Sequence, residues 1–460
     1  MIEGLKPYVE YKKSGLPWLG NVPAHWVTKR GKAYMTAIDR RSQAGKEELL
    51  TVSSARGVIP RNAAKVTMFK AESYAGYKLC WPGDLVINSL WAWGGGLGVT
   101  QHHGIISTAY SVYRPRPSAE MNPRFLHELV RSSSFNWELH VRSKGIWISR
   151  LQLTDTAFLD APIPLPPPDE QAAIVRFLDH ANRKIDGFIR AKRKLIGLLN
   201  EQKQAIIHRA VTRGLHPDVP LKPSGIPWLG DIPKHWEMRK LRQILTRKTE
   251  RNQPSLALLS VVREKGVIKR DTENFEDNHN FIPDDLSNYK VVRVGQFAMN
   301  KMKAWQGSFG VSQFEGIVSP AYFVFVLRYV GRDFFHTAIR SKAYVPFFTR
   351  ASDGVRVGQW DLAETRMREI PFFVPPSDEQ NAIVEYVAKD TEAATTAIAR
   401  TEREIALIQE YRTRLTADLV TGKLDVREAA AKLPATIDVG NAEEHSNEIS
   451  EGSEEEILES

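Results

Sequence analysis

Hydrogen-bonding side chains lie beside a turn glycine at two places in the sequence, in Ser143–Arg150 and in Ala351–Gln359. In the second stretch, Arg356 and Gln359 carry the groups that match the edges of guanine and adenine. Side chains of this kind in this setting predict the reading of base edges in a duplex. Because two such stretches occur in one chain, the elements that hold them are expected to occur twice.

A second pair of loops differs between the two halves although its surroundings are shared. Trp93 and Trp305 are equivalent, and several glycines around them are kept. The differing residues are Ser89-Leu90-Trp91 against Lys301-Met302-Lys303, and Gly94 and Gly96 against Gln306 and Ser308. This pattern predicts one scaffold that displays two reading loops. The candidates for base contacts are Trp91, Gln101, His102, His103, Lys144, Trp147, Arg150, Lys301, Lys303, Gln306, Ser308, Gln313, Arg356 and Gln359.

Basic residues gather around a Gly-Val-Ile turn in each half. They are Arg56 and Arg61 in the first half, and Arg263, Lys265, Lys269 and Arg270 in the second. Any one of them is equally well explained as a solvated surface charge. As a set they indicate contacts with the phosphates of a nucleic-acid backbone.

The sequence lacks the common catalytic and metal-binding motifs. The sequence contains no G-x-x-x-x-G-K-[ST] phosphate loop and no G-x-G-x-x-G opening a helix after a strand. His102 and His103 are adjacent, so on a strand they would point to opposite faces. Asn122-Pro-Arg-Phe125 lacks the second proline of the Asn-Pro-Pro-aromatic signature of amino-methyltransferases. We therefore expect no catalytic residue, no metal site and no cofactor in this chain.

The elements around the candidate loops repeat with a period near 210 residues. SGLPWLGNVPAHW at Ser14–Trp26 returns as SGIPWLGDIPKHW at Ser224–Trp236, with nine of thirteen positions identical. Short β-rich runs follow in both halves, for example 84–87 and 322–327, and then shorter helical stretches. Each half is therefore expected to hold one α+β domain behind a rigid, packed lead-in.

Each domain is followed by a long stretch with a coiled-coil repeat, Asp169–Leu215 and Asp378–Leu424. Positions spaced alternately by three and four residues are apolar at eight of eleven places in both copies, and the polar interruptions coincide. The seam residues are Val175, Leu178, Ile185, Ile189, Ile196, Leu199 and Ile206, and Val384, Val387, Ile398, Ile405, Ile408, Leu415 and Leu419. Two matching seams predict an antiparallel pair of helices, each on the order of 70 Å long.

Proline-rich hinges set the predicted boundaries. Ile163–Gln171 and Val374–Gln380 stop the preceding domain, and Asp169, Ser377 or Asp378 can cap the helix that follows. The predicted order is a first target domain at 1–168, a helix at 169–223, a second target domain at 224–377, a helix at 378–428 and an acidic, disordered tail at 429–460. The fold class is thus α+β, with two pseudo-symmetric α/β domains separated by an antiparallel coiled coil.

Charge and composition favour a polyanionic partner in a reducing compartment. The net charge is +9, yet the last eighteen residues hold eight glutamates and no lysine or arginine, so the rest carries about +17. A single cysteine, Cys80, excludes an internal disulfide framework. The start shows no signal-peptide pattern, and the apolar run 321–327 is too short to span a bilayer. We expect a soluble cytoplasmic protein.

This arrangement resembles the specificity subunit of type I restriction–modification systems. The resemblance covers Tyr8 to about Arg427 and lies in the W-L-G-x-[IV]-P-x-H-W lead-in, the P-P-x-[DE]-E-Q hinge, and the domain–helix–domain–helix order. It implies recognition of a bipartite, asymmetric DNA sequence by two target-recognition domains, with the helices as spacer and docking surface. The implied partners are two methylation subunits that use S-adenosylmethionine, and restriction subunits that use ATP and Mg²⁺.

Three other interpretations remain open at this point. The chain could serve a fused, type II-like methyltransferase–nuclease, which differs only in its partner. It could be a self-contained nucleic-acid enzyme, against which the missing motifs speak. It could also be a coiled-coil scaffold without a DNA role, which leaves the basic body and the divergent loops unexplained.

Overall fold

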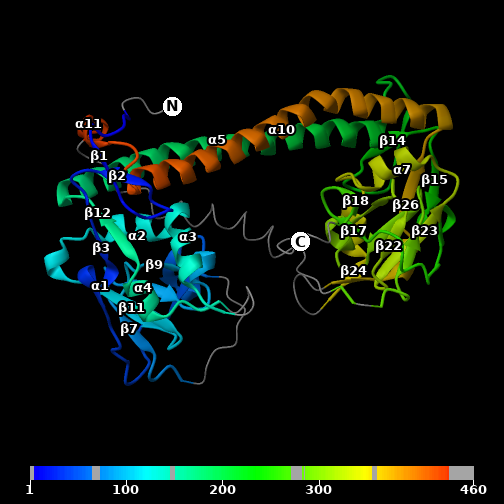
Figure 1. Ribbon diagram of the computed structural model, residues 1–460. Helices are drawn as coiled ribbons and strands as arrows, with labels where there is room; N and C mark the ends of the chain where they lie inside the picture. Colours follow the sequence, from blue (N-terminus) through cyan, green and yellow to red (C-terminus); the bar gives the residue numbers. More distant parts are fainter. Residues whose placement is uncertain are drawn as a thin grey trace. The chain divides into compact units, whose positions relative to one another are not determined.

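The computed structural model describes residues 5–64, 73–145, 151–270, 282–283, 285–354 and 360–434 (Figure 1). Four predicted contact residues, Trp147, Arg150, Arg356 and Gln359, lie outside the described residues, as does the acidic stretch at the end of the chain. The chain forms two compact units. The first contains Met1–Lys192 and Glu402–Ile437, and the described part of the second is Arg193–Thr401. Each unit therefore holds one predicted target domain with one half of each long helix.

The first unit is built on an antiparallel four-stranded sheet in the order β4-β11-β8-β9. Its strands are β4 (Met35–Ala37), β11 (Tyr110–Pro115), β8 (Leu85–Asn88) and β9 (Leu97–Val99). The pairs β5 (Leu50–Ser53) with β6 (Gly57–Pro60), and β7 (Lys78–Cys80) with β10 (Gly104–Ile106), accompany it. The apolar residues of β8 alternate between two clusters, since Leu85 and Ile87 face the main core and Val86 faces a smaller one.

Helices close the main core of this unit. Asn122 caps α2 (Pro123–Arg131) by accepting from the backbone N–H groups of Arg124 and Phe125. Ser132 caps α3 (Ser133–Arg142) in the same way through Phe135 N–H. The shorter elements are β1 (Tyr11–Lys13), β2 (Asn21–Pro23), β3 (Val27–Arg30), α1 (Gly31–Tyr34), η1 (Arg61–Ala63), η2 (Ala92–Gly94), η3 (Pro117–Ala119), α4 (Asp155–Leu159) and β12 (Pro162–Leu165).

The second unit repeats this architecture. Its sheet has the equivalent order β16-β23-β20-β21, formed by β16 (Leu245–Arg247), β23 (Tyr322–Leu327), β20 (Phe297–Asn300) and β21 (Phe309–Val311). The accompanying elements are β13 (Leu221–Pro223), β14 (Asp231–Pro233), β15 (Glu237–Lys240), α6 (Leu241–Ile244), β17 (Leu259–Val262), β18 (Gly266–Lys269), β19 (Lys290–Val292), η5 (Ala304–Gln306), β22 (Gly316–Val318), α7 (Arg332–Ile339), α8 (Val345–Arg350), β24 (Ser352–Asp353), β25 (Asp361–Leu362), α9 (Glu364–Arg368) and β26 (Pro371–Val374). The mixed α and β character predicted for both domains is confirmed.

The two long helices are α5 (Pro168–Arg213) and α10 (Ser377–Val420), which run side by side (Figure 1). Their pairing is antiparallel, because Lys192 of α5 bonds Glu404 of α10, whereas Asp186, earlier in α5, bonds Arg412, later in α10. Every predicted seam position is buried or half-buried, including Leu178 and Leu419 at 2% and 0% exposed. The coiled coil inferred from the repeat is confirmed.

The polar interruptions of the seam have partners of their own. Lys192 Nζ lies 2.7 Å from a carboxylate oxygen of Glu404, and Arg412 pairs with Asp186. The hydroxyls of Thr391 and Thr401 donate to carbonyls one turn earlier in their own helix, of Val387 and Ala397. Most of these polar groups are therefore bonded within the coiled coil, as register-setting positions require, although the buried Nε atom of Arg412 has no hydrogen-bond partner among the described residues.

The His-Trp end of each lead-in is hydrogen-bonded to the glutamate of the hinge that follows the same domain. In the first unit, Glu170 is 2% exposed and accepts hydrogen bonds from Tyr8 Oη at 2.5 Å and Trp26 Nε1 at 2.7 Å, with His25 Nε2 also at 2.7 Å. In the second, Glu379 bonds His235 Nε2 at 2.7 Å and Trp236 Nε1 at 3.1 Å. The packed lead-in predicted from the sequence thus has a charged acceptor at its centre.

The neighbouring hinge residue ties the helix to its domain. Gln171 accepts from Asn122 N–H at 2.7 Å and donates to the carbonyls of Glu120 and Pro166. Gln380 repeats this with Gly331 N–H at 2.7 Å and the carbonyl of Pro375. The Glu-Gln pair of the hinge therefore orients each target domain on its own helix.

The folded chain reaches further than the sequence predicted. The tail was expected to begin at residue 429, yet Ala429 and Ala430 are buried in a short helix, α11 (Arg427–Ala431). Their alanine side chains pack into the main core of the first unit, so these residues belong to the folded unit and the predicted boundary at 429 is wrong. Over the described residues, no helix combines the length and apolar character needed to cross a membrane.

Candidate nucleic-acid interface

A half-buried arginine holds two exposed loops of the first unit together. Arg131 of α2 donates to the carbonyls of Ser54 at 2.6 Å and Ala55 at 2.9 Å, in the turn between β5 and β6. It also donates to the carbonyl of Leu97 at 2.7 Å, where the η2 loop enters β9. Burial lowers the pKa of Arg131, although its carbonyl partners all accept from the charged form. The turn and the η2 loop are thereby fixed side by side.

The second unit uses the equivalent residue in the same way. Arg340, the residue directly after α7, donates to the carbonyls of Arg263 at 3.0 Å, Glu264 at 2.8 Å and Phe309 at 2.9 Å. These carbonyls belong to the turn between β17 and β18 and to the start of β21. The geometry of both turn-and-loop pairs is therefore set by the scaffold and not by the residues that they display.

A histidine one turn before each arginine completes the support. The Nδ1 atom of His127 accepts from Val99 N–H at 3.2 Å, and that of His336 accepts from Val311 N–H at 3.1 Å. Burial and the neighbouring arginine lower the pKa of each imidazole to about 4. Both histidines are consequently neutral at pH 7, as an accepting Nδ1 requires.

In the first unit the loop displays an exposed aromatic side chain. Trp91 is 46% exposed, and its ring centroid lies 4.7 Å from that of Trp93. A Cβ atom added at Gly94 or at Gly96 would come within 2.7 Å or 2.8 Å of Trp91. These glycines therefore make room for the tryptophan. Their difference from Gln306 and Ser308 in the second unit reflects this packing.

Lys144 and Arg56 lie around the same loop. Lys144 and Gln152 exchange backbone hydrogen bonds at 3.0 Å and 2.9 Å, and Leu153 N–H donates to the carbonyl of Ser89 at 2.9 Å. The segment that carries Trp147 and Arg150 therefore starts and ends beside Ser89, which precedes Trp91. Arg56, in the β5–β6 turn, donates to the carbonyl of Ala63. We call Arg56, Trp91 and Lys144 the first loop cluster.

The second loop cluster, formed by Arg263, Lys265, Lys301 and Lys303, carries cations at the equivalent place. Lys301 Nζ lies 2.8 Å from a carboxylate oxygen of Asp361, and the carbonyl of Lys301 accepts from Leu362 N–H. These two contacts attach the β24–β25 hairpin, which encloses residues 354–360, to the η5 loop. In the first unit the segment 143–153 is attached to the η2 loop in the same way. Gln306 is half-buried at the end of η5.

Ser308 does not belong to this surface. It is 2% exposed, and its N–H donates to the carbonyl of Lys303. Its side chain packs at the entry to β21 because the following residue, Phe309, is a fully buried part of the core. The expectation that Ser308 reads a base is corrected to a framework role.

The remaining candidates lie at the opposite end of the hairpins. Gln101, His102 and His103 follow β9, whereas the η2 loop precedes it. His103 packs against Trp81 with ring centroids 5.2 Å apart. Arg61 follows β6, away from its turn, and in the second unit Lys269, Arg270 and Gln313 occupy the equivalent places, with Lys269 over the Phe314 ring. The structure thus divides the predicted contact residues of each unit between two ends, and only the loop clusters adjoin the turn.

Sequence reasoning missed the supports of this surface. His127 and Arg131, and His336 and Arg340, form the same H-x-x-x-R pattern in both halves, 209 residues apart. They lie in or directly after α2 and α7, in stretches that the sequence marked only as helical. Identity between the two copies at a histidine and an arginine one turn apart was the signal that could have revealed them.

The fold of this chain is similar to that of several solved structures. No protein-family model and no curated protein matches the chain. Among solved structures, a chain from the work on complex assembly and conformational transition of the type I R-M system matches with a TM-score of 0.57 at 15% identity, over 87% of this chain and 98% of that chain. The HsdS subunit from Thermoanaerobacter tengcongensis gives 0.39 at 17% identity, over 87% and 98%. The type I S subunit from M. genitalium gives 0.31 at 10%, over 86% and 96%. In fold, the chain therefore resembles a chain of a type I R-M system.

Proposed function

We propose that this chain is the DNA-recognition subunit of a type I restriction–modification complex, and that each unit reads one half of a two-part target. The observation that carries the proposal is the loop cluster. Both units hold it with the same half-buried arginine and histidine, yet Trp91 stands in one where Lys301 and Lys303 stand in the other. One framework with two different exposed sets is what recognition of two different half-sites needs.

The two clusters suit different contacts with a duplex. An exposed tryptophan offers an apolar face for contact with thymine methyl groups or for stacking, whereas lysines donate to the acceptor atoms of guanine or to phosphates. Arg56, Arg263 and Lys265 lie on the adjoining turns, where phosphate contacts would fix the register. The positive charge of the body supplies the salt-dependent part of the affinity.

The chemistry of the complex would belong to the partners. We propose that α5 and α10 set the distance between the half-sites and dock two methylation subunits, which use S-adenosylmethionine to methylate adenine. Restriction subunits would hydrolyse ATP with Mg²⁺ and cut DNA. In this scheme the chain itself acts without a catalytic residue or cofactor, in the cytoplasm.

Methylome sequencing of a host that expresses the chain with its neighbouring methylation subunit tests the proposal. We expect a new split motif, with two half-sites around a fixed gap. Changing Lys301 and Lys303 to alanine should alter only one half-site, and Trp91→Ala only the other, by roughly 1–3 kcal/mol of discrimination. The proposal fails if the purified chain binds the methylation subunit but no sequence preference appears, or if either variant changes both half-sites.

A further inference from the structure

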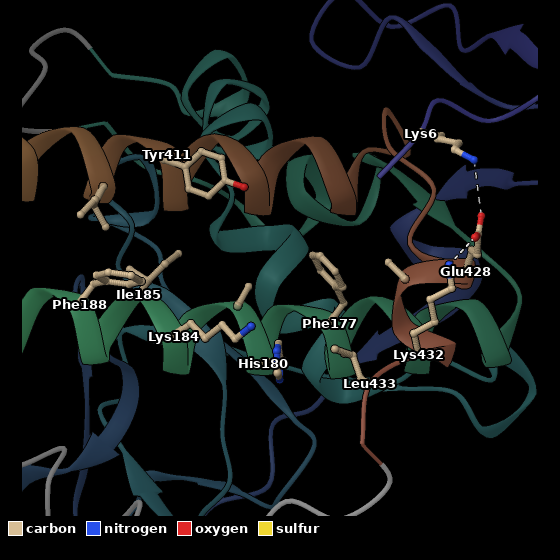
Figure 2. A pocket seen from close by; sticks show the side chains of 13 residues that line it. Lys6, Phe177, His180, Lys184, Ile185, Phe188, Tyr411, Glu428, Lys432 and Leu433 are labelled. Carbon is tan, nitrogen blue, oxygen red and sulfur yellow. Dashed lines mark hydrogen bonds and ion pairs between the residues drawn. The ribbon is translucent and has the colours of Figure 1, made fainter. Parts of the chain in front are cut away.

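An open apolar groove runs along the coiled coil of the first unit, between α5, α10 and α11 (Figure 2). Its volume is about 970 Å³. Phe177, Ile185, Phe188, Ile408, Tyr411 and Leu433 form its apolar lining. Phe188 is 62% exposed and Tyr411 is 38% exposed. A surface of this kind on a folded protein marks a place where another segment binds.

The rim of the groove carries more positive than negative charge. Lys6, Lys184 and Lys432 line it together with a single carboxylate, that of Glu428. Glu428 pairs with Lys432 at 2.6 Å and lies 3.8 Å from Lys6. Lys184 lies across the groove from this group, beside Ile185 (Figure 2). An occupant with apolar side chains and negative charge would complement both the lining and the rim.

The internal repeat does not account for the groove. The residues equivalent to Lys184, Ile185 and Phe188 in the second copy are Ala393, Ala394 and Ala397, and Gln202 is equivalent to Tyr411. The second copy also has no counterpart of α11 next to its coiled-coil half among the described residues. The groove is therefore specific to the part of the chain from which the C-terminal segment departs.

The chain itself leads out from the edge of this groove. Leu433 lines the groove, and the carbonyl of Pro434, the last described residue, accepts from Arg176 at 3.1 Å. The sequence continues for 26 residues, in which eight glutamates after residue 442 surround Ile449, Ile457 and Leu458. The three apolar residues match the apolar lining of the groove, and the glutamates match its basic rim.

We propose that the C-terminal segment Glu448–Glu459 binds this groove, with Ile449, Ile457 and Leu458 against Phe188 and Tyr411 and its glutamates beside Lys184 and Lys432. The tether is long enough, because 14 residues between Pro434 and Ile449 span roughly 20 Å as a flexible chain. Its effective concentration at the groove is on the order of millimolar. Even a weak contact is then mostly formed within one molecule.

The groove lies on the helices to which the proposed function assigns the methylation subunits. This consequence depends on the proposed function, whereas occupation of the groove does not. If both hold, the acidic segment competes with a partner for the helix surface in the first unit only. Removing it should then strengthen binding of a methylation subunit there.

Cysteine cross-linking tests occupation directly. Cys80 is fully buried, and burial raises the pKa of its thiol to about 12. The native cysteine therefore does not form disulfides in this experiment. We would compare Lys184→Cys with Ile457→Cys against the matched pair Ala393→Cys with Ile457→Cys, since both helix positions are exposed and equivalent in the repeat. Disulfide formation within one molecule should be at least ten-fold faster for the Lys184 pair. Equal rates would overturn the proposal.

A peptide assay separates apolar from purely electrostatic attraction. A synthetic peptide of residues 443–460 is added to the chain truncated after Gly440, and a second peptide carries serine at the three apolar positions. The native peptide should bind at least ten-fold more tightly and lose affinity with salt; equal affinity of the two peptides would contradict groove binding. If cross-linking and peptide binding succeed but truncation leaves methylation-subunit binding unchanged, the segment occupies the groove and only the competition fails.

Discussion

A few polar side chains, each present twice, fix how the target domains are held. Glu170, itself almost closed to water, bonds the buried Tyr8 and Trp26 and the exposed His25. A carboxylate in such a site is stabilised only while its donors remain, and the donors are left unsatisfied if it goes. Burial and Glu170 together raise the pKa of Tyr8 far above its ordinary range, so Tyr8 donates at every pH at which the protein folds.

Replacing Glu170 by glutamine should therefore destabilise the first unit by about 2–4 kcal/mol. The amide keeps the shape but offers one accepting oxygen and turns an N–H₂ group toward the remaining donors. Urea unfolding followed by tryptophan fluorescence would measure the loss. Glu379→Gln is the matched control, and its effect should be smaller because that side chain is 16% exposed against 2% and holds two donors. Equal losses would contradict the account.

The half-buried histidines His127 and His336 predict a pH dependence with a definite sign. Each has a pKa of about 4 in the folded chain, below the ordinary value of 6.5. Between pH 6.5 and 4, each histidine is therefore protonated in the unfolded chain but neutral in the folded chain. Stability is complete above pH 6.5 and falls as the pH drops toward 4. Between pH 7.5 and 5, each unit should lose about 2 kcal/mol through this residue.

Asparagine at the same positions provides the test. His127→Asn and His336→Asn keep an acceptor near Nδ1 but cannot take up a proton, so the variants should be less sensitive to acid than the parent between pH 7.5 and 5. Urea unfolding at several pH values measures this slope. An unchanged slope in the double variant would show that other groups dominate acid unfolding.

The residue scale is also where sequence reasoning was least complete. Trp91 was singled out because the difference between the two copies marked the η2 loop, whereas Arg56 and Lys144 were predicted separately, as a phosphate contact and as part of the 143–150 stretch. The structure places all three around one loop. Gln101, His102 and His103 were placed with them on residue type alone, yet β9 separates the two groups. Ser308 was misjudged for a related reason, since a polar residue next to a buried strand looks the same in sequence as one on a loop tip.

At the scale of elements, the coiled coil shows why periodicity was informative. An apolar repeat of 3.5 residues can be satisfied only by a partner with the same repeat, and the chain contains one. The partner of each polar interruption could not be predicted, because Lys192 bonds Glu404 and Arg412 bonds Asp186, residues just off the seam. Such contacts depend on how far one helix has slid along the other.

The Lys192–Glu404 pair should consequently contribute to register. Both side chains are about one-third exposed, so the pair is expected to contribute about 0.5–1 kcal/mol of coupling. Lys192→Glu alone should lower the stability of the first unit, and Lys192→Glu with Glu404→Lys should restore most of it. A double-mutant cycle from urea unfolding would measure the coupling, and additive losses without rescue would show that the pair is incidental.

For the whole molecule, the long helices matter because they are continuous. α5 runs for 46 residues and α10 for 44 without a break, and each takes part in both units. The duplication was visible in the sequence because lead-in, domain and helix all recur in one order. The division into units was not visible, since it follows from the antiparallel pairing, which places the end of α10 beside the start of α5.

If these helices set the gap between two half-sites, lengthening them should change that gap and nothing else. One heptad inserted into each helix, after Ile196 in α5 and after Thr401 in α10, keeps the seams matched because the two positions lie near each other in the antiparallel register. A heptad adds about 10.5 Å, or about three base pairs at about 3.4 Å per pair. Methylome sequencing should then return both original half-sites with the spacer longer by about three base pairs. A heptad in α5 alone serves as the control, since it offsets the seam and should abolish methylation. If the half-site sequences changed while the gap stayed the same, the helices would not be the element that measures distance.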